Sequence, residues 1–467
     1  MAAAVSCLTR LGQQPLSWDE AVTLSAARHT PGRLLALLAH TDAPLGLYYA
    51  LMHGWVRLGD AAGITAMEAW LRLPSAVAAI AAVALTAVLA ADWYGPRAGL
   101  VAGALLAVHP LLVFYAHDAR PYALATFLVV ALTWLFVRIR RHPTTTGLGA
   151  YAVLATVTIY THLFSSLVLI VHFLVVAVRG PRRVAWSVVA AAVAVATAPL
   201  VLISSRETGE IGWIPPASAA SIASVLGKLG GGVAMALALG VVAAGAATRR
   251  ITRRSAFLLA WALVPPLLLV LADLVTPVLV ARYALVAVPG LAVAVAAAGV
   301  RVRNRIVAGG TILALVAGLA TTVVQQSRPY KYEDFRGAAE LIDDTFRPGD
   351  AVLYLPAATR VGLAAYPPAK PGETPVDDIA LRGDGAPVRA SDIAGVEVSP
   401  AAIASRLRSH ANVYLVGNPY AGITGPGAGP GDQAKIDALR SGYTEVWSRA
   451  FGVVTVTLFS RRITPAP

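Results

Sequence analysis

The stretch GLGAYAVLATVTIYTHLFSSLVLIVHFLVVAV, residues 147–178, is an apolar block of 32 residues between two groups of arginines, at 138–141 and 179–183. One membrane-spanning helix needs about 20 apolar residues, so the block is too long for one span and suits two short ones. Basic loops stay in the cytoplasm, and two such loops enclose an even number of spans. We therefore expect two short helices that meet near Thr161 and His162 at the outer face.

The composition of the whole chain indicates a membrane protein. Of the 467 residues, 57% are hydrophobic and only 13% are charged, which is typical of a polytopic membrane protein. The net charge of +13 would suit a nucleic-acid partner, but the arginines gather between apolar stretches, where membrane topology explains them. We therefore expect membrane lipid, and no nucleic acid, around this chain. Cys7 is the only cysteine, which excludes an intramolecular disulfide framework.

The same counting of spans extends over the rest of the chain. Further basic groups at 249–254 and 301–305 are placed in the cytoplasm. The expected spans are 71–91, 97–115, 121–138, two within 147–178, 186–204, 233–248, 256–275, 284–300 and 306–323. The segment from Pro44 to Leu58 has only 15 residues, so we expect it to lie in the outer interface instead. The prediction is a mainly α, polytopic protein of the plasma (inner) membrane with about ten transmembrane helices.

Carboxylates are rare before residue 325. The ten are Asp19, Glu20, Asp42, Asp60, Glu68, Asp92, Asp118, Glu207, Glu210 and Asp273. On the expected topology nine lie on the outer side and only Asp92 lies inside, which places the chemistry on the outer face. Ionisable groups near a bilayer are costly and indicate function by default. The adjacent acids Asp19 and Glu20 are the most unusual of them; the alternative is a helix N-terminus, where acids favour the helix dipole.

From about residue 325 the chain changes character and becomes polar. Strand patterns at 351–355, 412–416 and 453–459 alternate with helical patterns at 332–346 and 433–440, which predicts a small α/β domain. The glycine- and proline-rich stretch 421–431 is predicted as a loop without a phosphate-binding fingerprint. We assign this domain no chemistry: acceptor docking and a structural lid stay open. The expected division is an outer catalytic loop with juxtamembrane helices (1–70), a transmembrane domain (71–324) and an extracytoplasmic α/β domain (325–467).

Several short motifs in a fixed order resemble a known group of enzymes. They are Trp18-Asp19-Glu20-Ala21, Asp42 ahead of Leu47-Tyr48-Tyr49, Arg72-Leu73-Pro74-Ser75, Tyr115 to Tyr122, His162 in Tyr160 to Phe164, and Arg282-Tyr283 before Pro289-Gly290. Together they resemble the polyprenyl-phosphate-sugar-dependent glycosyltransferases of the protein O-mannosyltransferase and aminoarabinose-transferase type (glycosyltransferase family 39 type), in the bacterial mannosyltransferase branch. The resemblance covers roughly residues 15–300 and implies the GT-C membrane fold.

The resemblance implies a reaction. Such enzymes transfer a sugar, mannose in this branch, from a polyprenyl-phosphate donor to an acceptor outside the cytoplasm and invert the anomeric centre. The acceptor is a protein, a glycolipid or a polysaccharide. Asp19 is the expected general base, and Arg120 and Arg282 are the expected phosphate ligands, because a guanidinium matches phosphate oxygens in a fork. Glu20 and Asp118 either orient the acceptor or hold a divalent metal ion, which prefers oxygen ligands.

The remaining candidates are weaker. Asp42, Tyr122, His162 and Tyr283 are expected to bind substrate, and His162 also joins Glu20 and Asp118 as a metal ligand. No organic cofactor is expected. Simpler alternatives exist: an Asp118–Arg120 pair at the end of a span, a satisfied polar side chain for His162, and tyrosines of the membrane interface for Tyr122 and Tyr283.

Two features depart from the resemblance. Relatives carry a transmembrane helix before the acidic pair, whereas residues 1–16 include Arg10 and two glutamines and make no convincing span. We expect a gene model that starts too late; the alternative is a protein that lacks this first helix, which would put both its fold and its activity in question. Relatives also carry His-Pro-Pro after the Asp42-like acid, where this chain has Pro44-Leu45-Gly46.

Two other classes of protein stay open. One is a transporter or flippase of a lipid-linked substrate, and the other is a catalytically inactive protein with the same fold. Transporters place ionisable groups near the midplane and contain internal repeats. Here the charges gather at the outer ends of the spans, which favours an interfacial enzyme.

Overall fold

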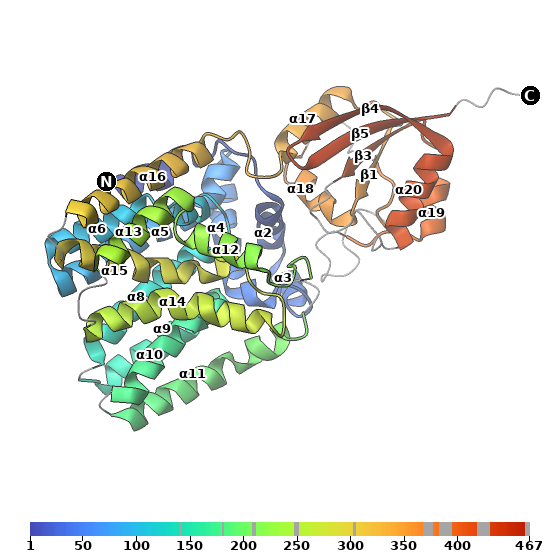
Figure 1. Cartoon of the computed structure of the whole chain (residues 1–467). Helices are drawn as coiled ribbons and strands as arrows, with labels where there is room; N and C mark the ends of the chain where they lie inside the picture. The colour runs from blue at the N-terminus through green and yellow to red at the C-terminus, as the bar shows by residue number, and fades with distance from the viewer. Residues whose placement is uncertain are drawn as a thin grey trace, which may run out of the picture. The chain divides into compact units, whose positions relative to one another are not determined.

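The structure is a computed structural model of the chain (Figure 1). It describes residues 1–140, 142–179, 182–207, 212–246, 252–301, 305–367, 377–382, 395–417 and 430–462. Parts of the basic groups, Glu210 and most of the predicted loop 421–431 lie outside these residues. The chain divides into two compact units: 1–11, 42–51 and 69–328 form the first, and 12–41, 52–68 and 329–467 form the second. Residues 1–70, expected as one outer segment, therefore contribute to both units.

Every predicted span corresponds to a helix or to a pair of helices. They are α5 (Met67–Tyr94), α6 (Pro96–Ala107) with α7 (Pro110–Ala116), α8 (Tyr122–Ile139), α9 (Thr145–Thr161), η2 (Leu163–Ser165) with α10 (Ser166–Arg179), α11 (Arg183–Ser204), α12 (Ala219–Leu229) with α13 (Val233–Ala246), α14 (Arg253–Asp273), η4 (Ala281–Ala287) with α15 (Val288–Arg301), and α16 (Arg305–Gln326). Among the described residues six helices are long and apolar enough to cross a membrane, or up to eight if each of two bent pairs is one span. The prediction of a mainly α, multi-pass membrane protein is confirmed.

The block 147–178 forms two helices, as predicted. Helix α9 ends at Thr161, and His162 has an extended backbone (φ −160°, ψ 114°) before η2 begins. The hydroxyl groups of Thr158 and Thr161 donate to carbonyl groups four residues earlier in α9, at 2.6 and 2.9 Å. These contacts satisfy the polar groups of the helix without water. The segment Pro44 to Leu58 also forms a helix, within α4 (Gly46–Ala61).

Two bent helix pairs meet in the first unit. Helices α6 and α7 bend by 62° at His109, where Pro110 begins the new helix without an N–H group. Helices α12 and α13 bend by 77° at Gly231 and Gly232, whose φ angles of 81° and 94° favour glycine. The ring Nε2 of His109 lies 3.0 Å from the carbonyl oxygen of Leu229, so the two breaks are joined.

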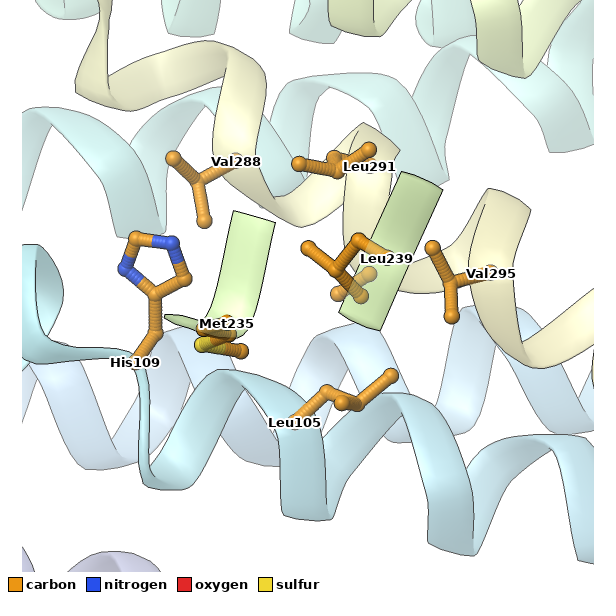
Figure 2. A pocket seen from close by; sticks show the side chains of 8 residues that line it. Leu105, His109, Met235, Leu239, Val288, Leu291 and Val295 are labelled. Atoms are coloured by element: carbon orange, nitrogen blue, oxygen red, sulfur yellow. The ribbon is translucent and has the colours of Figure 1, made fainter. Parts of the chain in front are cut away.

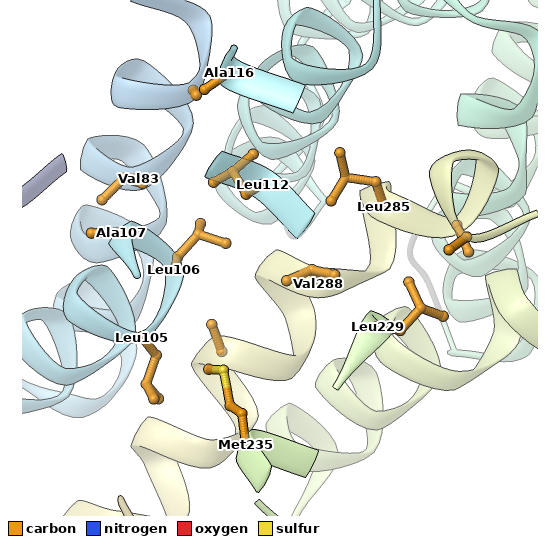
Figure 3. Packing of buried hydrophobic residues seen from close by; sticks show 14 of the residues in the cluster. Val83, Leu105, Leu106, Ala107, Leu112, Ala116, Leu229, Met235, Leu285 and Val288 are labelled. Carbon is orange, nitrogen blue, oxygen red and sulfur yellow. The ribbon is translucent and has the colours of Figure 1, made fainter. Parts of the chain in front are cut away.

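The main apolar core of the first unit surrounds these breaks. Figure 3 shows Leu106 and Leu112 of α6 and α7 packed with Met235 of α13 and with Leu285 and Val288 of η4 and α15. Beside this core a narrow apolar pocket is flanked by the ring of His109 (Figure 2). Its other lining residues are Leu105, Met235, Leu239, Val288, Leu291, Ala292 and Val295. Among the described residues no aspartate, glutamate, lysine or arginine lines this pocket.

A second core contains one buried histidine. His172 of α10 is fully buried and stacks on Phe136 with ring centroids 4.3 Å apart. The Thr133 hydroxyl donates its proton to the carbonyl of Val129, so it accepts from Nε2–H of His172 at 3.2 Å. Nδ1 of His172 is then the unprotonated nitrogen and accepts from the Tyr151 hydroxyl at 3.0 Å. Side chains from α8, α9 and α10 thus satisfy one another in an apolar environment.

Tyr151→Phe should therefore destabilise the first unit by about 1–2 kcal/mol, because it leaves a buried acceptor on His172 without its donor. The measurement is thermal unfolding of the purified chain in detergent. Tyr160→Phe is the matched control, since the Tyr160 hydroxyl also donates a hydrogen bond, to the carbonyl of Ala196 at 3.0 Å, but this bond is exposed to solvent. Equal effects of the two variants would contradict the assigned role of His172.

The second unit contains the predicted α/β domain. Its strands are β1 (Ala351–Leu355), β2 (Asp377–Asp378), β3 (Asn412–Gly417), β4 (Tyr443–Phe451) and β5 (Val454–Arg461), in the order β2-β1-β3-β5-β4. Strands β2, β1 and β3 are parallel, and β5 runs antiparallel to β3 and β4. The described helices that lie wholly within this unit are α2 (Trp18–Arg28), α3 (Pro31–Leu38), α17 (Phe335–Thr345), the short α18 (Arg360–Ala364), α19 (Pro400–Leu407) and α20 (Pro430–Gly442). Figure 1 shows the sheet with α17 and α18 on one face and α19 and α20 on the other.

Alternation along β1 explains these layers. Val352 and Tyr354 pack in the core of α17 and α18, whereas Ala351 and Leu353 pack in the core of α19 and α20. Successive side chains of a strand point to opposite faces, so β1 is buried on both sides. This explains its uninterrupted apolar sequence.

Candidate functional site

The loop between α7 and α8 places charged side chains inside the first unit. Asp118 and Arg120 are only 5% and 8% exposed, although charged residues are rarely buried. His117 holds the loop in place, with Nδ1 at 2.9 Å from the carbonyl of Val113 and Nε2 at 3.0 Å from that of Thr9. These contacts indicate a structural role for His117, which was not predicted as a site residue.

Arg120 is oriented by a chain of two hydrogen bonds. Its Nη1 donates to the Tyr49 hydroxyl at 3.2 Å, and Tyr49 donates to Oδ2 of Asp42 at 2.7 Å. Burial, reinforced by the Asp42 carboxylate and opposed by Arg120, raises the pKa of Tyr49 well above its ordinary value. Tyr49 therefore stays protonated and donates to Asp42. Asp42, predicted to bind substrate, here positions Arg120 through Tyr49, a link that the sequence did not reveal.

His162, Arg282 and three aromatic rings form a second part of the site. His162 is 5% exposed, and its ring contacts Tyr122 and Tyr283 at centroid distances of 5.2 and 5.6 Å. The Arg282 guanidinium lies 5.7 Å from the rings of Tyr122 and Tyr283 and 4.7 Å from Trp213. Such contacts hold a guanidinium by cation–π attraction.

The two parts belong to one electropositive centre. The charges of Arg282 and Arg120 both act on His162, so the two guanidinium groups lie close to this ring. Nδ1 of His162 is buried and has no hydrogen-bond partner among the described residues. The structure therefore brings together Arg120, Tyr122, His162, Arg282 and Tyr283, which the sequence predicted from the outer ends of different spans.

Glu207 adds a second acid next to Asp42. Its two carboxylate oxygens accept from the backbone N–H of Ala43 at 3.3 and 3.2 Å. Partial burial raises the pKa of Glu207, the backbone hydrogen bond lowers it, and the charge of Asp42 raises it further. The net effect is a raised pKa. The sequence placed Glu207 in an outer loop without assigning it a role.

The acidic pair Asp19–Glu20 belongs to the second unit, at the start of α2. Ser17 and Glu20 form a capping box, in which Oε2 of Glu20 accepts from the backbone N–H of Ser17 at 3.0 Å. The same carboxylate lies 3.1 Å from Nζ of Lys331. Glu20 is fully buried, whereas Asp19 is half-buried. A role for both acids in one site with Arg120 and Arg282 stays a prediction.

The predicted metal ligands Glu20, Asp118 and His162 do not favour a divalent cation. The Glu20 carboxylate is occupied by Ser17 and Lys331, and two guanidinium charges act on His162. Like charges disfavour a cation in such surroundings. Over the ranges that the structure describes, no group of three or more His, Cys, Asp and Glu side chains is placed to hold a metal ion.

The fold of this chain is similar to that of a protein of known structure. The structure of ArnT from Cupriavidus metallidurans in the apo state matches with a TM-score of 0.59 and 13% sequence identity, over 97% of this chain and 96% of that chain. The structure of the same protein bound to undecaprenyl phosphate matches with a TM-score of 0.59 and 13% identity, over 98% and 96%. The chain has the GT-C fold of ArnT.

The coverage includes the membrane helices and the C-terminal domain, so the predicted fold class is confirmed for both parts. No family model and no curated protein matches the sequence. At 13% identity the ArnT-type fold is preserved while most side chains differ, which leaves the chemistry to be argued from the site.

Proposed function

We propose that the chain is a membrane glycosyltransferase that takes its sugar from a polyprenyl-phosphate donor. The observation that carries the proposal is the centre formed by the buried Arg120 and His162 and the half-buried Arg282, because each guanidinium group can bind two phosphate oxygens and attracts them most strongly away from water. The ArnT-type fold supports it, since one ArnT structure is bound to undecaprenyl phosphate.

The proposed reaction is an inverting displacement. The acceptor hydroxyl attacks the anomeric carbon, the bond from this carbon to the phosphate oxygen breaks, and its electron pair leaves with the polyprenyl phosphate. Asp19 takes the proton of the acceptor hydroxyl as general base. Arg120 and Arg282 stabilise the negative charge that develops on the phosphate. Tyr49 and Asp42 keep the Arg120 guanidinium in one orientation, so little reorganisation is needed during the reaction.

Other side chains of the first unit are proposed to recognise the sugar. The aromatic rings of Tyr122 and Tyr283 lie beside His162, and the buried Asp118 lies in the same loop as Arg120. The resemblance to the bacterial branch favours mannose as the sugar and a protein, glycolipid or polysaccharide as the acceptor. The arginine pattern favours an inner-membrane location with the site and the α/β domain on the extracytoplasmic side.

The second candidate is a flippase, and the two bent helix pairs favour it. Broken helices are typical of transporters, in which their ends bind substrate. Here, however, His109 joins the breaks and the adjacent pocket is lined by apolar side chains (Figure 2). His109 is the one polar side chain among the described residues that line this pocket, and none of them carries a fixed charge to bind a sugar phosphate, which favours the transferase.

Proteoliposomes that contain the purified chain, labelled polyprenyl-phosphate mannose and an extract of acceptors distinguish the two candidates. A transferase releases unlabelled polyprenyl phosphate in step with the labelling of the acceptor. A flippase moves the donor intact to the other leaflet without cleaving it. Donor that is moved but never cleaved would contradict the proposed function.

A further inference from the structure

Glu20 and Lys331 form a buried ion pair that the proposed reaction does not use. The side chains are 0% and 2% exposed and lie 3.1 Å apart. Removing two charges from water has a large desolvation cost for each charge, and the attraction between them offsets this cost only when their geometry is good. A helix N-terminus alone does not need such a pair, because the hydroxyl of Ser17 already accepts from the N–H of Glu20.

Lys331 is held by the sheet of the α/β domain. The carbonyl of Tyr332 accepts from the N–H of Val453 at 3.0 Å, and the N–H of Asp334 donates to the carbonyl of Phe451 at 3.1 Å. Gly452 between them has φ 66°, and a Cβ there would lie 2.2 Å from the carbonyl oxygen of Tyr332. The segment that carries Lys331 therefore lies directly on the turn between β4 and β5.

The same domain also holds the residues before Asp19. The indole Nε1 of Trp18 donates to the carbonyl of Ala358 at 2.9 Å, and the N–H of Leu16 donates to the Tyr366 hydroxyl at 2.6 Å. The residues before Asp19 and the side chain of Glu20 after it thus all contact the α/β domain.

We propose that Lys331 is a positioning residue for Asp19: its buried pair with Glu20 fixes the first turn of α2 and cancels the charge that Glu20 places next to Asp19. The two adjacent acids then have different roles. Glu20 is structural and neutralised, whereas Asp19 is half-buried and is the residue proposed as the base. The α/β domain, which the sequence left without a role, carries the ammonium group. The effect of Lys331 on sugar transfer rests on the proposed function, whereas its effect on the protonation of Asp19 does not.

Other charged groups surround this segment. Arg336 of α17 binds Glu68 through two nitrogens, and the Tyr366 hydroxyl donates to the same carboxylate at 3.2 Å. Arg336 is 34% exposed, so solvent screens this second pair more than the first. Glu333 and Asp334 follow Lys331 in sequence, and Asp334 caps α17 through the N–H of Gly337.

The test measures the protonation of Asp19 directly in the purified full chain. Carbodiimide activates protonated carboxyl groups, and mass spectrometry quantifies the labelling of Asp19 between pH 3 and pH 8. Glu20→Gln leaves the Lys331 charge alone, so the midpoint of Asp19 labelling should fall by about 1 pH unit. The double variant Glu20→Gln with Lys331→Met removes both charges and should return the midpoint to that of the wild type. Lys331→Arg keeps the pair and should leave it unchanged.

The opposite result overturns the inference. If Glu20→Gln and the double variant give the same midpoint, the Lys331 charge does not act on Asp19. Arg336→Met is the matched control, because it breaks the more exposed pair of Arg336 with Glu68. It should shift the midpoint of Asp19 labelling by less than a third of the shift caused by Glu20→Gln. Loss of folding cannot mimic the expected pattern, because the double variant is the more heavily altered protein and should behave like the wild type.

A transfer assay on the same variants separates this inference from the proposed function. If the wild type transfers no sugar, the proposed function fails, while the labelling still decides the role of Lys331. If the wild type transfers sugar, the acidic limb of its pH profile should move with the labelling midpoint in each variant. A limb that stays fixed while labelling shifts would overturn the positioning role.

Discussion

Replacing Asp19 by asparagine should lower the turnover of sugar transfer by about 10²- to 10⁴-fold and leave KM for the lipid donor nearly unchanged. Asparagine keeps the size and the helix-start position of Asp19 but cannot accept the proton of the acceptor hydroxyl. The measurement is the initial rate of transfer from polyprenyl-phosphate mannose in membranes that contain equal amounts of each variant.

Asp60→Asn is the matched control, because Asp60 is an exposed acid of the same unit at the end of α4. It should retain the full wild-type rate. Equal transfer by the wild type and the Asp19 variant would exclude Asp19 as the base.

Replacing Arg282 by methionine should lower kcat/KM by about 10²- to 10³-fold, because the leaving phosphate loses a preorganised positive charge. Methionine keeps much of the length of the side chain and its packing on Trp213, Tyr122 and Tyr283. Arg282→Lys should recover only part of the loss, since an ammonium group lacks the planar fork. The measurement is steady-state kinetics with the lipid donor varied.

Two further variants sharpen this prediction. Tyr49→Phe removes the hydrogen bonds to Arg120 and Asp42 but no charge, so it should lower kcat/KM by about tenfold. Arg97→Met, at an exposed arginine in the first turn of α6, should have no effect. A Tyr49 variant with wild-type kinetics would show that Arg120 needs no orientation.

The membrane part was largely predictable from the sequence. Apolar stretches and the arginines that flank them depend on local sequence only, so the ends of α9 and α10 and the break at His162 followed from counting. Strands β1, β3 and β5 are apolar and were predicted, whereas β4 was missed because most of its side chains are exposed. The grouping of residues 12–41 with 329–467 depends on contacts across the whole chain, which no local pattern encodes.

The site was predictable in part for the same reason. Arg120, His162 and Arg282 were identified because they stand in short motifs, at the outer ends of the expected spans, that resemble those of known glycosyltransferases. The contacts of Tyr49 and Trp213 were missed, since interface aromatics are common and carry no signal of their own. Lys331 had an overlooked signal: the chain contains only four lysines, and two of them, Lys331 and Lys435, form buried ion pairs.

The central claim is that Arg120 and Arg282 receive the phosphate of a polyprenyl lipid, and thermal unfolding in detergent with undecaprenyl phosphate tests it most directly. At a hundredfold excess over Kd the lipid should stabilise the wild type by about 2.7 kcal/mol. Uncharged undecaprenol should give much less stabilisation, and the double variant Arg120→Met with Arg282→Met should lose the difference between the two lipids. Equal stabilisation by both lipids in the wild type would contradict the account.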